Sequence, residues 1–122
     1  KDYDYIEKEI AAIVNVAKGN TVKVIIETCY LTDEEKEEVC KRASNAKATF
    51  VKTSTGFGTG GATASDVKLM KQSINENMFV KASGGIKTLE NVESLVAAGA
   101  GRIGASSGID IITEYNKIVD NV

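Results

Sequence analysis

Hydrophobic and polar positions follow two different periods that take turns along the chain. Short β-branched stretches with alternating faces, typical of strands, are separated by longer stretches in which apolar residues recur every three or four positions, as in amphipathic helices. Predicted strands cover residues 22–28, 49–54, 78–83 and 102–105, and predicted helices cover 4–18, 33 to about 46, 63–74, 88–98 and 109–119. Strands that alternate with helices pair in parallel through right-handed crossovers. The pattern therefore predicts an α/β fold.

Several predicted helices carry sequence signals for their ends. Thr32 and Glu35 fit a capping box, in which each side chain binds a backbone amide at the start of the helix. Thr88 is placed to cap the fourth predicted helix, and Gly19 and Gly99 follow helices as C-terminal caps. The chain has no proline and 11 glycines, so glycine marks the boundaries between elements.

The second and third predicted strands repeat almost the same sequence. Residues 50–57 read FVKTSTGF, and residues 79–86 read FVKASGGI. Lys23, Lys52 and Lys81 are spaced 29 residues apart. A strand–helix unit of this length is typical of a (β/α)8 barrel, because eight such units make up about 250 residues. We therefore expect residues 1–122 to form a single domain equal to half of a TIM barrel, with about four strands and five helices.

Lysines occupy the face of the predicted strands that would line a barrel interior. Strand side chains alternate between two faces, and the apolar face, such as that of Val22, Val24 and Ile26, suits the contact with helices. Lys52 and Lys81 then point inward near the C-terminal strand ends, where barrel enzymes hold their sites. A strand lysine is more often a solvated residue than a catalyst, but the recurrence at equal positions favours a function.

Paired inward lysines suit Schiff-base chemistry. Two ammonium groups in one cavity repel each other and lose hydration, and both effects lower the pKa of an amine. A neutral amine attacks a carbonyl to form an imine, whose protonated form accepts electrons when a neighbouring bond breaks. The chain has no histidine, which excludes His-based triads, His general bases and most zinc sites.

Glycines and serines follow the second, third and fourth predicted strands and suggest an anion site. Backbone amides at glycine loops and helix N-termini bind anions, and serine hydroxyls add donors. One such loop alone would favour simple turns and helix caps, whereas three consecutive loops on one rim favour a phosphate. The stretch from Gly58 to Gly61 is predicted to be a mobile turn outside the site. The candidate residues are Gly56, Gly84, Gly85, Gly104, Ser106 and Ser107.

Composition narrows the class of partner and the cellular setting. The 15 basic and 17 acidic residues are scattered and give a net charge of −2, so no basic stripe predicts nucleic-acid binding. The chain has no run of about 18 apolar residues, so the sequence predicts no membrane span. The two cysteines, Cys29 and Cys40, are too few for a disulfide scaffold, and no secretory signal opens the chain. We therefore expect a reducing, cytoplasmic setting.

Taken together, the motifs resemble the C-terminal half of deoxyribose-phosphate aldolases. The segments KVIIET, FVKTSTGF, GGAT, VKASGGIKT and GRIGASSG occur in this order across nearly the whole chain. That family consists of class I aldolases on a TIM barrel, which cleave 2-deoxy-D-ribose 5-phosphate reversibly to glyceraldehyde 3-phosphate and acetaldehyde. The resemblance implies a Schiff-base lyase that acts without a cofactor or a metal.

The resemblance also implies a role for each matching residue. Lys52 would form the Schiff base, and Lys81 would help Lys52 lose its proton and take part in proton transfer. Lys23 would line the substrate site. The glycines and serines of the three loops match positions around the substrate phosphate. Phe57 stands where some members carry a lysine.

The same resemblance places the family's first four strands, one of which carries the catalytic aspartate, before Lys1. Four parallel strands leave two unpaired edges and would expose Ile25, Phe50 and Phe79 on the inner face. We therefore expect the chain to form a homo-oligomer or to pair with the missing N-terminal half.

Two other functions stay open at this point. One is a non-catalytic half-barrel fragment that retains phosphate binding. The other is a different phosphate-binding barrel enzyme, against which the doubled FVK motif argues, because one Schiff-base lysine rarely needs a twin in phase.

Overall fold

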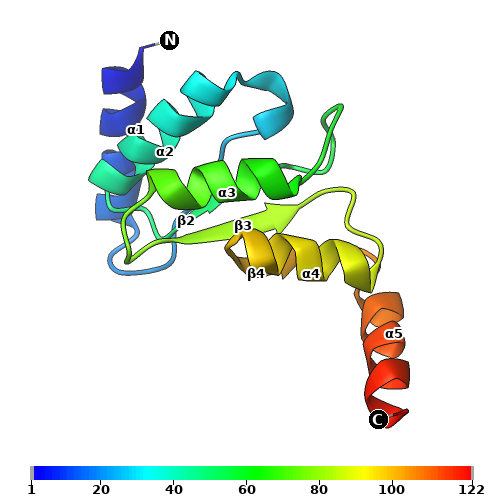
Figure 1. Cartoon of the computed structure of the whole chain (residues 1–122). Coiled ribbons are helices and arrows are strands. Elements are labelled where there is room, and N and C mark those ends of the chain that lie inside the picture. The colour runs from blue at the N-terminus through cyan, green and yellow to red at the C-terminus, as the bar shows by residue number, and fades with distance from the viewer. Residues whose placement is uncertain (1, 122) are drawn as a thin grey trace.

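Strands and helices alternate along the chain, as the sequence pattern predicts (Figure 1). The computed structural model describes residues 2–121, so residues 1 and 122, the ends of the predicted domain, lie outside the described residues. The elements are α1 (Tyr3–Val16), β1 (Lys23–Ile25), the 3-10 helix η1 (Thr28–Tyr30), α2 (Asp33–Asn45), β2 (Phe50–Lys52), α3 (Ala64–Ser73), β3 (Phe79–Ser83), α4 (Leu89–Ala98), β4 (Ala100–Gly104) and α5 (Gly108–Asp120).

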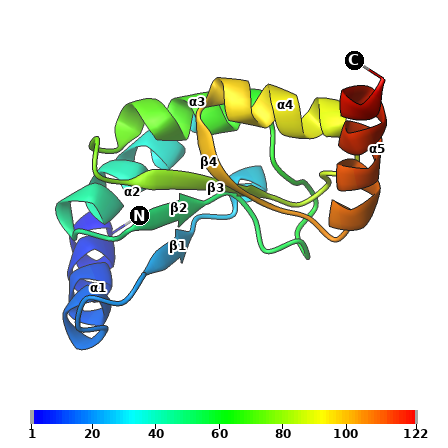
Figure 2. The same ribbon diagram turned by 90° about the horizontal axis from the view of Figure 1, so that it is seen from below.

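The four strands form one parallel sheet in the order β1-β2-β3-β4. Figure 2 shows α3 and α4 on one side of this sheet, while the other side is left open. Within residues 2–121, β1 and β4 each pair with one strand and form the two edges. Consecutive parallel strands with helices on one face make up half of a β/α barrel, which confirms the predicted fold class.

Several strand boundaries differ from the predicted ones: β2 ends at Lys52 and not at residue 54, and two other differences follow from the backbone between elements. β1 ends at Ile25 and not at residue 28, because Glu27 takes a left-handed backbone (φ 52°) and Thr28 begins η1. β4 begins at Ala100 and not at residue 102, directly after Gly99, whose left-handed φ of 119° ends α4. Periodicity alone does not reveal either change of direction.

The predicted helix caps are mostly confirmed. The hydroxyl of Thr32 accepts from the amide of Glu35 at 3.2 Å, and the Glu35 carboxylate accepts from the amide of Thr32 at 2.9 Å. Thr88 forms a second capping box at the start of α4. The expectation for Gly19 is wrong, because α1 ends at Val16 and its C-cap is Ala17, whose amide donates to the Ile13 carbonyl.

The apolar side of the sheet packs on the helices and forms the core. Val51 of β2 and Val80 of β3 are fully buried on this side. They share the core with Cys40, Val67 and Met70 of α2 and α3, whose burial supplies the main favourable contribution to folding. Burial also raises the pKa of the Cys40 thiol to about 12, so this cysteine stays protonated.

The open side of the sheet is partly covered by its own side chains. Ile25 and Phe79 are 45% and 47% exposed, as expected for an uncovered face. Phe50 is only 6% exposed, so its predicted exposure is wrong. The ring of Phe79 meets it edge-on at 5.6 Å, and the cations of Lys23 and Arg102 lie over its ring.

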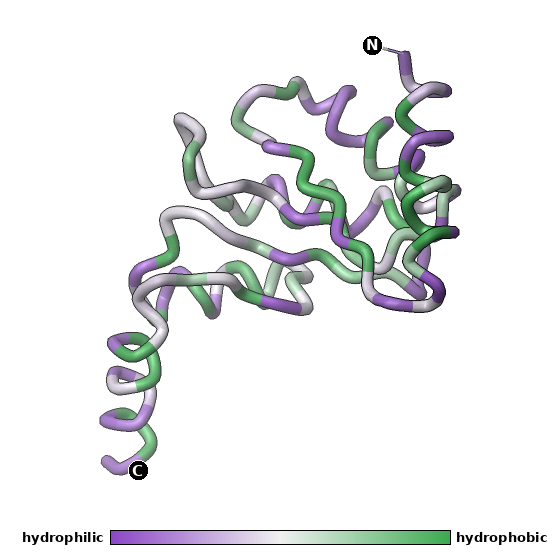
Figure 3. Tube along the Cα trace, turned by 180° about the vertical axis from the view of Figure 1, so that it is seen from behind, coloured by the Kyte–Doolittle hydropathy of each residue, from purple (hydrophilic) through white to green (hydrophobic). Residues whose placement is uncertain are grey.

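Helix α5 extends away from the sheet, as Figure 1 shows. Much of its apolar side is exposed to solvent. In Figure 3 the apolar residues of α5 gather along one side of the helix. The exposed apolar residues of α5 are Ile109, Ile112, Tyr115, Ile118 and Val119. Between residues 2 and 121, no helix has the length and apolarity needed to cross a membrane.

Candidate active site

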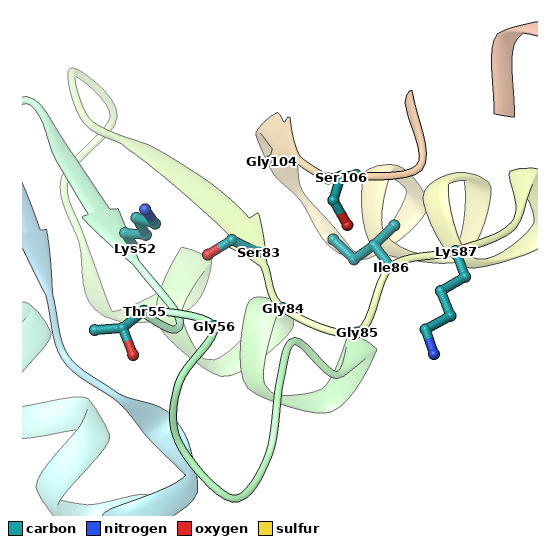
Figure 4. A pocket seen from close by; sticks show the side chains of 11 residues that line it. Lys52, Thr55, Gly56, Ser83, Gly84, Gly85, Ile86, Lys87, Gly104 and Ser106 are labelled. Carbon is teal, nitrogen blue, oxygen red and sulfur yellow. The ribbon is translucent and has the colours of Figure 1, made fainter. Parts of the chain in front are cut away.

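A cavity of about 340 Å³ opens at the C-terminal ends of β2, β3 and β4 (Figure 4). Parallel strands of a barrel end on one rim, and βα loops on that rim hold the active sites of barrel enzymes. The volume suits a small ligand. The cavity is lined by Lys52, Thr55, Gly56, Ser83, Gly84, Gly85, Ile86, Lys87, Gly104, Ala105 and Ser106.

Most of the predicted site residues meet at this cavity. Lys52 and Ser106 line it together with the predicted glycines that follow β2 and β3 and with Gly104 of β4. Lys23, Lys81 and Ser107 lie outside the lining. The loops that follow three successive strands therefore converge on one cavity, as their sequences predict.

Lys52 and Lys81 are neighbours in the sheet. The register of β2 and β3 places the two residues opposite each other, as their 29-residue spacing predicts. Burial lowers the pKa of Lys81, and the charges of Lys52, Lys23 and Arg102 lower it further. A Cβ atom at Gly104 would lie 3.0 Å from Cε of Lys81, so the missing side chain of Gly104 leaves room for this lysine.

A buried hydroxyl network fixes the ends of β2 and β3 below the cavity. The hydroxyl of Thr53 donates to the Ser83 carbonyl at 3.0 Å and accepts from the Ser83 amide at 3.1 Å. The Ser54 hydroxyl donates to the Thr53 hydroxyl at 3.2 Å, and the Ser83 hydroxyl donates to the Ser54 carbonyl at 2.7 Å. These bonds set the position of Ser83, which lines the cavity, relative to Lys52.

The glycine rim has the backbone geometry of an anion site. Gly84 and Gly85 both lie in the left-handed region, with φ of 87° and 72°. Such turns point successive amides toward one side, where an anion can accept from them. No atom lies within 4 Å of the position a Cβ would take at Gly85 or at Gly56, so both border open space.

Glu27 supports this rim, a role that the sequence did not reveal. Its carboxylate accepts from the Thr55 hydroxyl at 2.5 Å and from the Thr55 amide at 3.2 and 3.3 Å. Thr55 in turn accepts from the amide of Phe57 at 3.1 Å, so the turn around Gly56 is held at its base. The contact spans 28 residues and depends on the left-handed backbone of Glu27, and neither feature has a sequence signal.

Five lining residues were not predicted: Thr55, Ser83, Ile86, Lys87 and Ala105. Each lies within two residues of a predicted one in the sequence, so a wider window around the glycine motifs would have included them. In the part of the chain that the structure describes, no group of three or more His, Cys, Asp or Glu side chains could hold a metal ion.

The sequence of the chain is similar to those of known aldolases. The model of the DeoC/LacD family aldolases matches residues 4–114. A deoxyribose-phosphate aldolase of Thermoanaerobacter sp. (strain X514) is 56% identical over 120 residues, which cover 96% of this chain and 54% of the relative. One from Thermococcus kodakarensis is 57% identical over 114 residues, covering 92% of this chain and 51% of the relative.

A solved structure agrees with the sequence matches. The tetrameric deoxyribose phosphate aldolase from Aeropyrum pernix superposes with a TM-score of 0.86 at 33% identity, over 95% of this chain and 51% of that chain. This chain thus spans about half the length of the relatives it matches. Because the family model covers all but the ends of the sequence, the chain belongs to the DeoC/LacD aldolase family.

Proposed function

We propose that this chain supplies the Schiff-base lysine and the phosphate site of a deoxyribose-phosphate aldolase. The reaction is the reversible cleavage of 2-deoxy-D-ribose 5-phosphate to glyceraldehyde 3-phosphate and acetaldehyde. The observation that carries the proposal is the Lys52–Lys81 pair beside a cavity rimmed by left-handed glycines. The names of relatives above 50% identity support the same reaction.

In this proposal, Lys52 acts as the nucleophile. Its neutral amine attacks the aldehyde carbon of the open-chain sugar phosphate, and loss of water gives an iminium ion. The C2–C3 bond then breaks, its electron pair moves into the iminium ion to form an enamine, and the C3 hydroxyl loses its proton as glyceraldehyde 3-phosphate leaves. Protonation of the enamine and hydrolysis release acetaldehyde and regenerate the amine. Lys81, opposite Lys52 in the sheet, takes part in these proton transfers.

The phosphate is assigned to the rim of the cavity. Gly84 and Gly85 offer backbone amides, and Ser106 and Ser107 precede α5, whose N-terminus favours an anion. Gly56 and Gly104 border the same space and permit a close approach of the ligand, while Lys23 of β1, on the inner face, is assigned to the substrate side of the site.

The open sheet supports an assembly with a second β/α half. Within the described residues, the edges of β1 and β4 and the apolar stripe of α5 have no covering element. We assign this half-barrel domain a partner that is either the N-terminal half of a whole barrel, carrying the family's aspartate, or a second copy. The tetramer of the Aeropyrum pernix relative supports a homo-oligomer of the whole enzyme.

Borohydride trapping tests the nucleophile. Incubation of the chain with acetaldehyde and borohydride is expected to give a two-carbon adduct on the peptide that contains Lys52, because imine formation needs only a neutral amine and a carbonyl. Lys52→Met should lose this adduct, whereas Lys68→Met, which removes an exposed lysine of α3, should retain it. Peptide mass mapping reads out both.

Two outcomes would speak against the assignment. Adducts confined to lysines other than Lys52 would move the nucleophile elsewhere. A chain that binds phosphate but gives no adduct would instead support the non-catalytic half-barrel.

Ser106→Asp tests the phosphate site. A carboxylate at this position would repel the anion and should weaken the binding of inorganic phosphate at least about tenfold. Ser106→Ala removes the hydroxyl without adding charge and should weaken it by a few-fold at most. Calorimetric or NMR titration with phosphate gives both affinities. An unchanged affinity in Ser106→Asp would place the phosphate elsewhere.

A further inference from the structure

The pairing of β3 with β4 contains an irregularity that changes which residue of β4 faces inward. Val80 lies opposite Ala100, but the next residue of β3, Lys81, lies opposite Arg102. Gly101 is therefore an extra residue in β4. In regular pairing Lys81 would face Gly101, and Arg102 would point to the helix side, because strand side chains alternate. The bulge thus brings Arg102 to the inner face beside Lys81, in the way that bulges near active sites re-aim side chains.

The neighbouring aromatic rings show why glycine fits at the bulge. A Cβ at position 101 would lie 3.3 Å from the ring of Phe79. That ring packs edge-on against Phe50 at a centroid distance of 5.6 Å. Gly101 therefore allows the aromatic pair to sit directly beside β4, where Arg102 follows.

The Phe50 ring holds the guanidinium of Arg102 in place through a cation–π contact. Cζ of Arg102 lies 4.7 Å from the centroid of the Phe50 ring, within the range of a cation–π contact. The ring itself is 6% exposed and held by Phe79, so its position is well defined. Lys23 also contacts it, with Nζ 5.6 Å from the centroid.

The contact with Phe50 keeps the permanent charge of Arg102 near Lys81. The cations around Lys81 come from the three other strands of the sheet: Lys23 of β1, Lys52 of β2 and Arg102 of β4. None of these groups forms an ion pair with a carboxylate inside the range 2–121. An arginine guanidinium keeps its charge in a protein, unlike an amine. Arg102 is therefore the neighbour whose repulsion persists at every working pH.

We propose that Arg102 is a positioning residue of this site, held by the β4 bulge and the Phe50 ring so that its permanent charge bears on Lys81. Lys81 consequently gives up its proton more readily and is better able to exchange protons with the substrate. The catalytic benefit rests on the proposed aldolase function, whereas the electrostatic effect on Lys81 can be measured without turnover.

An NMR titration tests the inference directly. In the chain labelled with 13C-lysine, the Cε signal of Lys81 is identified by its absence in Lys81→Arg, and its pKa is followed in each variant. Arg102→Met should raise the pKa of Lys81 by about half a unit, a threefold change in proton affinity at the separation and screening of this open face. Arg102→Lys keeps a cation and should shift the pKa of Lys81 less. Phe50→Leu removes the ring that holds Arg102 and should also raise the pKa of Lys81. Lys68→Met, which removes an exposed charge on α3, should leave it unchanged.

The outcomes separate this inference from the proposed function. A Lys81 pKa that is the same in Arg102→Met, in Phe50→Leu and in the unmodified chain would overturn the role of Arg102, even if Lys52 is trapped by acetaldehyde. Absence of trapping together with the expected rise would contradict the Schiff-base assignment and leave the effect of Arg102 intact. Circular dichroism on each variant confirms that the titrations compare folded chains.

Discussion

Replacing Thr53 with valine is expected to lower the free energy of unfolding by about 2–4 kcal/mol, because the exchange leaves several buried polar groups without a partner. Thr53 is fully buried, and its hydroxyl bonds the Ser83 amide, the Ser83 carbonyl and the Ser54 hydroxyl. Valine has nearly the same shape, so it opens no cavity. The decrease in the free energy of unfolding therefore measures the contribution of the hydrogen bonds that join the ends of β2 and β3.

Urea unfolding followed by circular dichroism measures this difference. The matched control is Thr59→Val, at an exposed position in the loop after β2, which should change the free energy of unfolding by no more than about 0.5 kcal/mol. An unfolding midpoint of Thr53→Val equal to that of the unmodified chain would mean that water replaces the lost hydroxyl and that the network does not hold the site together.

Much of the fold can be predicted because strand and helix periods are local properties of the sequence. The apolar face of each predicted strand packs on the helices, as the full burial of Val51 and Val80 shows. The 29-residue repeat also fixes the register of two strands, because equal positions in consecutive units of a parallel sheet lie side by side. This is why the sequence alone brings Lys52 and Lys81 together.

The inner face is less predictable, because its details depend on contacts between strands. Alternation counted along β4 does not reveal the extra residue Gly101, so the position of Arg102 beside Lys81 could not be predicted from the sequence. The predicted exposure of Phe50 is wrong for the same reason. Its ring is covered by Arg102, Lys23 and Phe79, which come from other strands, so this contact could not be predicted from the sequence of β2.

The rim of the cavity has some features that are local in the sequence and others that depend on contacts between distant residues. Glycine after a strand is a local signal, and Gly56, Gly84 and Gly104 were found in this way. The support under the rim is not local, since Glu27, after β1, accepts from Thr55, after the neighbouring strand β2. A single sequence therefore indicates where the candidate ligand site lies, whereas the residues that hold it in shape emerge only from the folded chain.

Gly61→Ala is expected to weaken phosphate binding at least about tenfold and to lower the free energy of unfolding by about 1–3 kcal/mol, the usual cost of forcing extra volume into a packed site. A Cβ at this position would overlap the carbonyl group of Gly84. The approach is held by a hydrogen bond of 3.0 Å from the amide of Ala62 to the Gly84 carbonyl. Because both partners are backbone, no change of rotamer relieves the overlap, and the left-handed turn at Gly84 must move away from its position in the cavity wall.

Gly108→Ala is the matched control for this substitution. A Cβ there meets no atom within 4 Å, and the residue opens α5, where alanine favours the helix, so stability should stay equal or rise slightly. Phosphate titration and urea unfolding of the two variants separate a contact at Gly61 from a general effect of added methyl groups. If Gly61→Ala binds phosphate as well as the unmodified chain does, the loop from Gly58 to Gly61 is the mobile turn that its composition suggests, and the shape of the phosphate site does not depend on it.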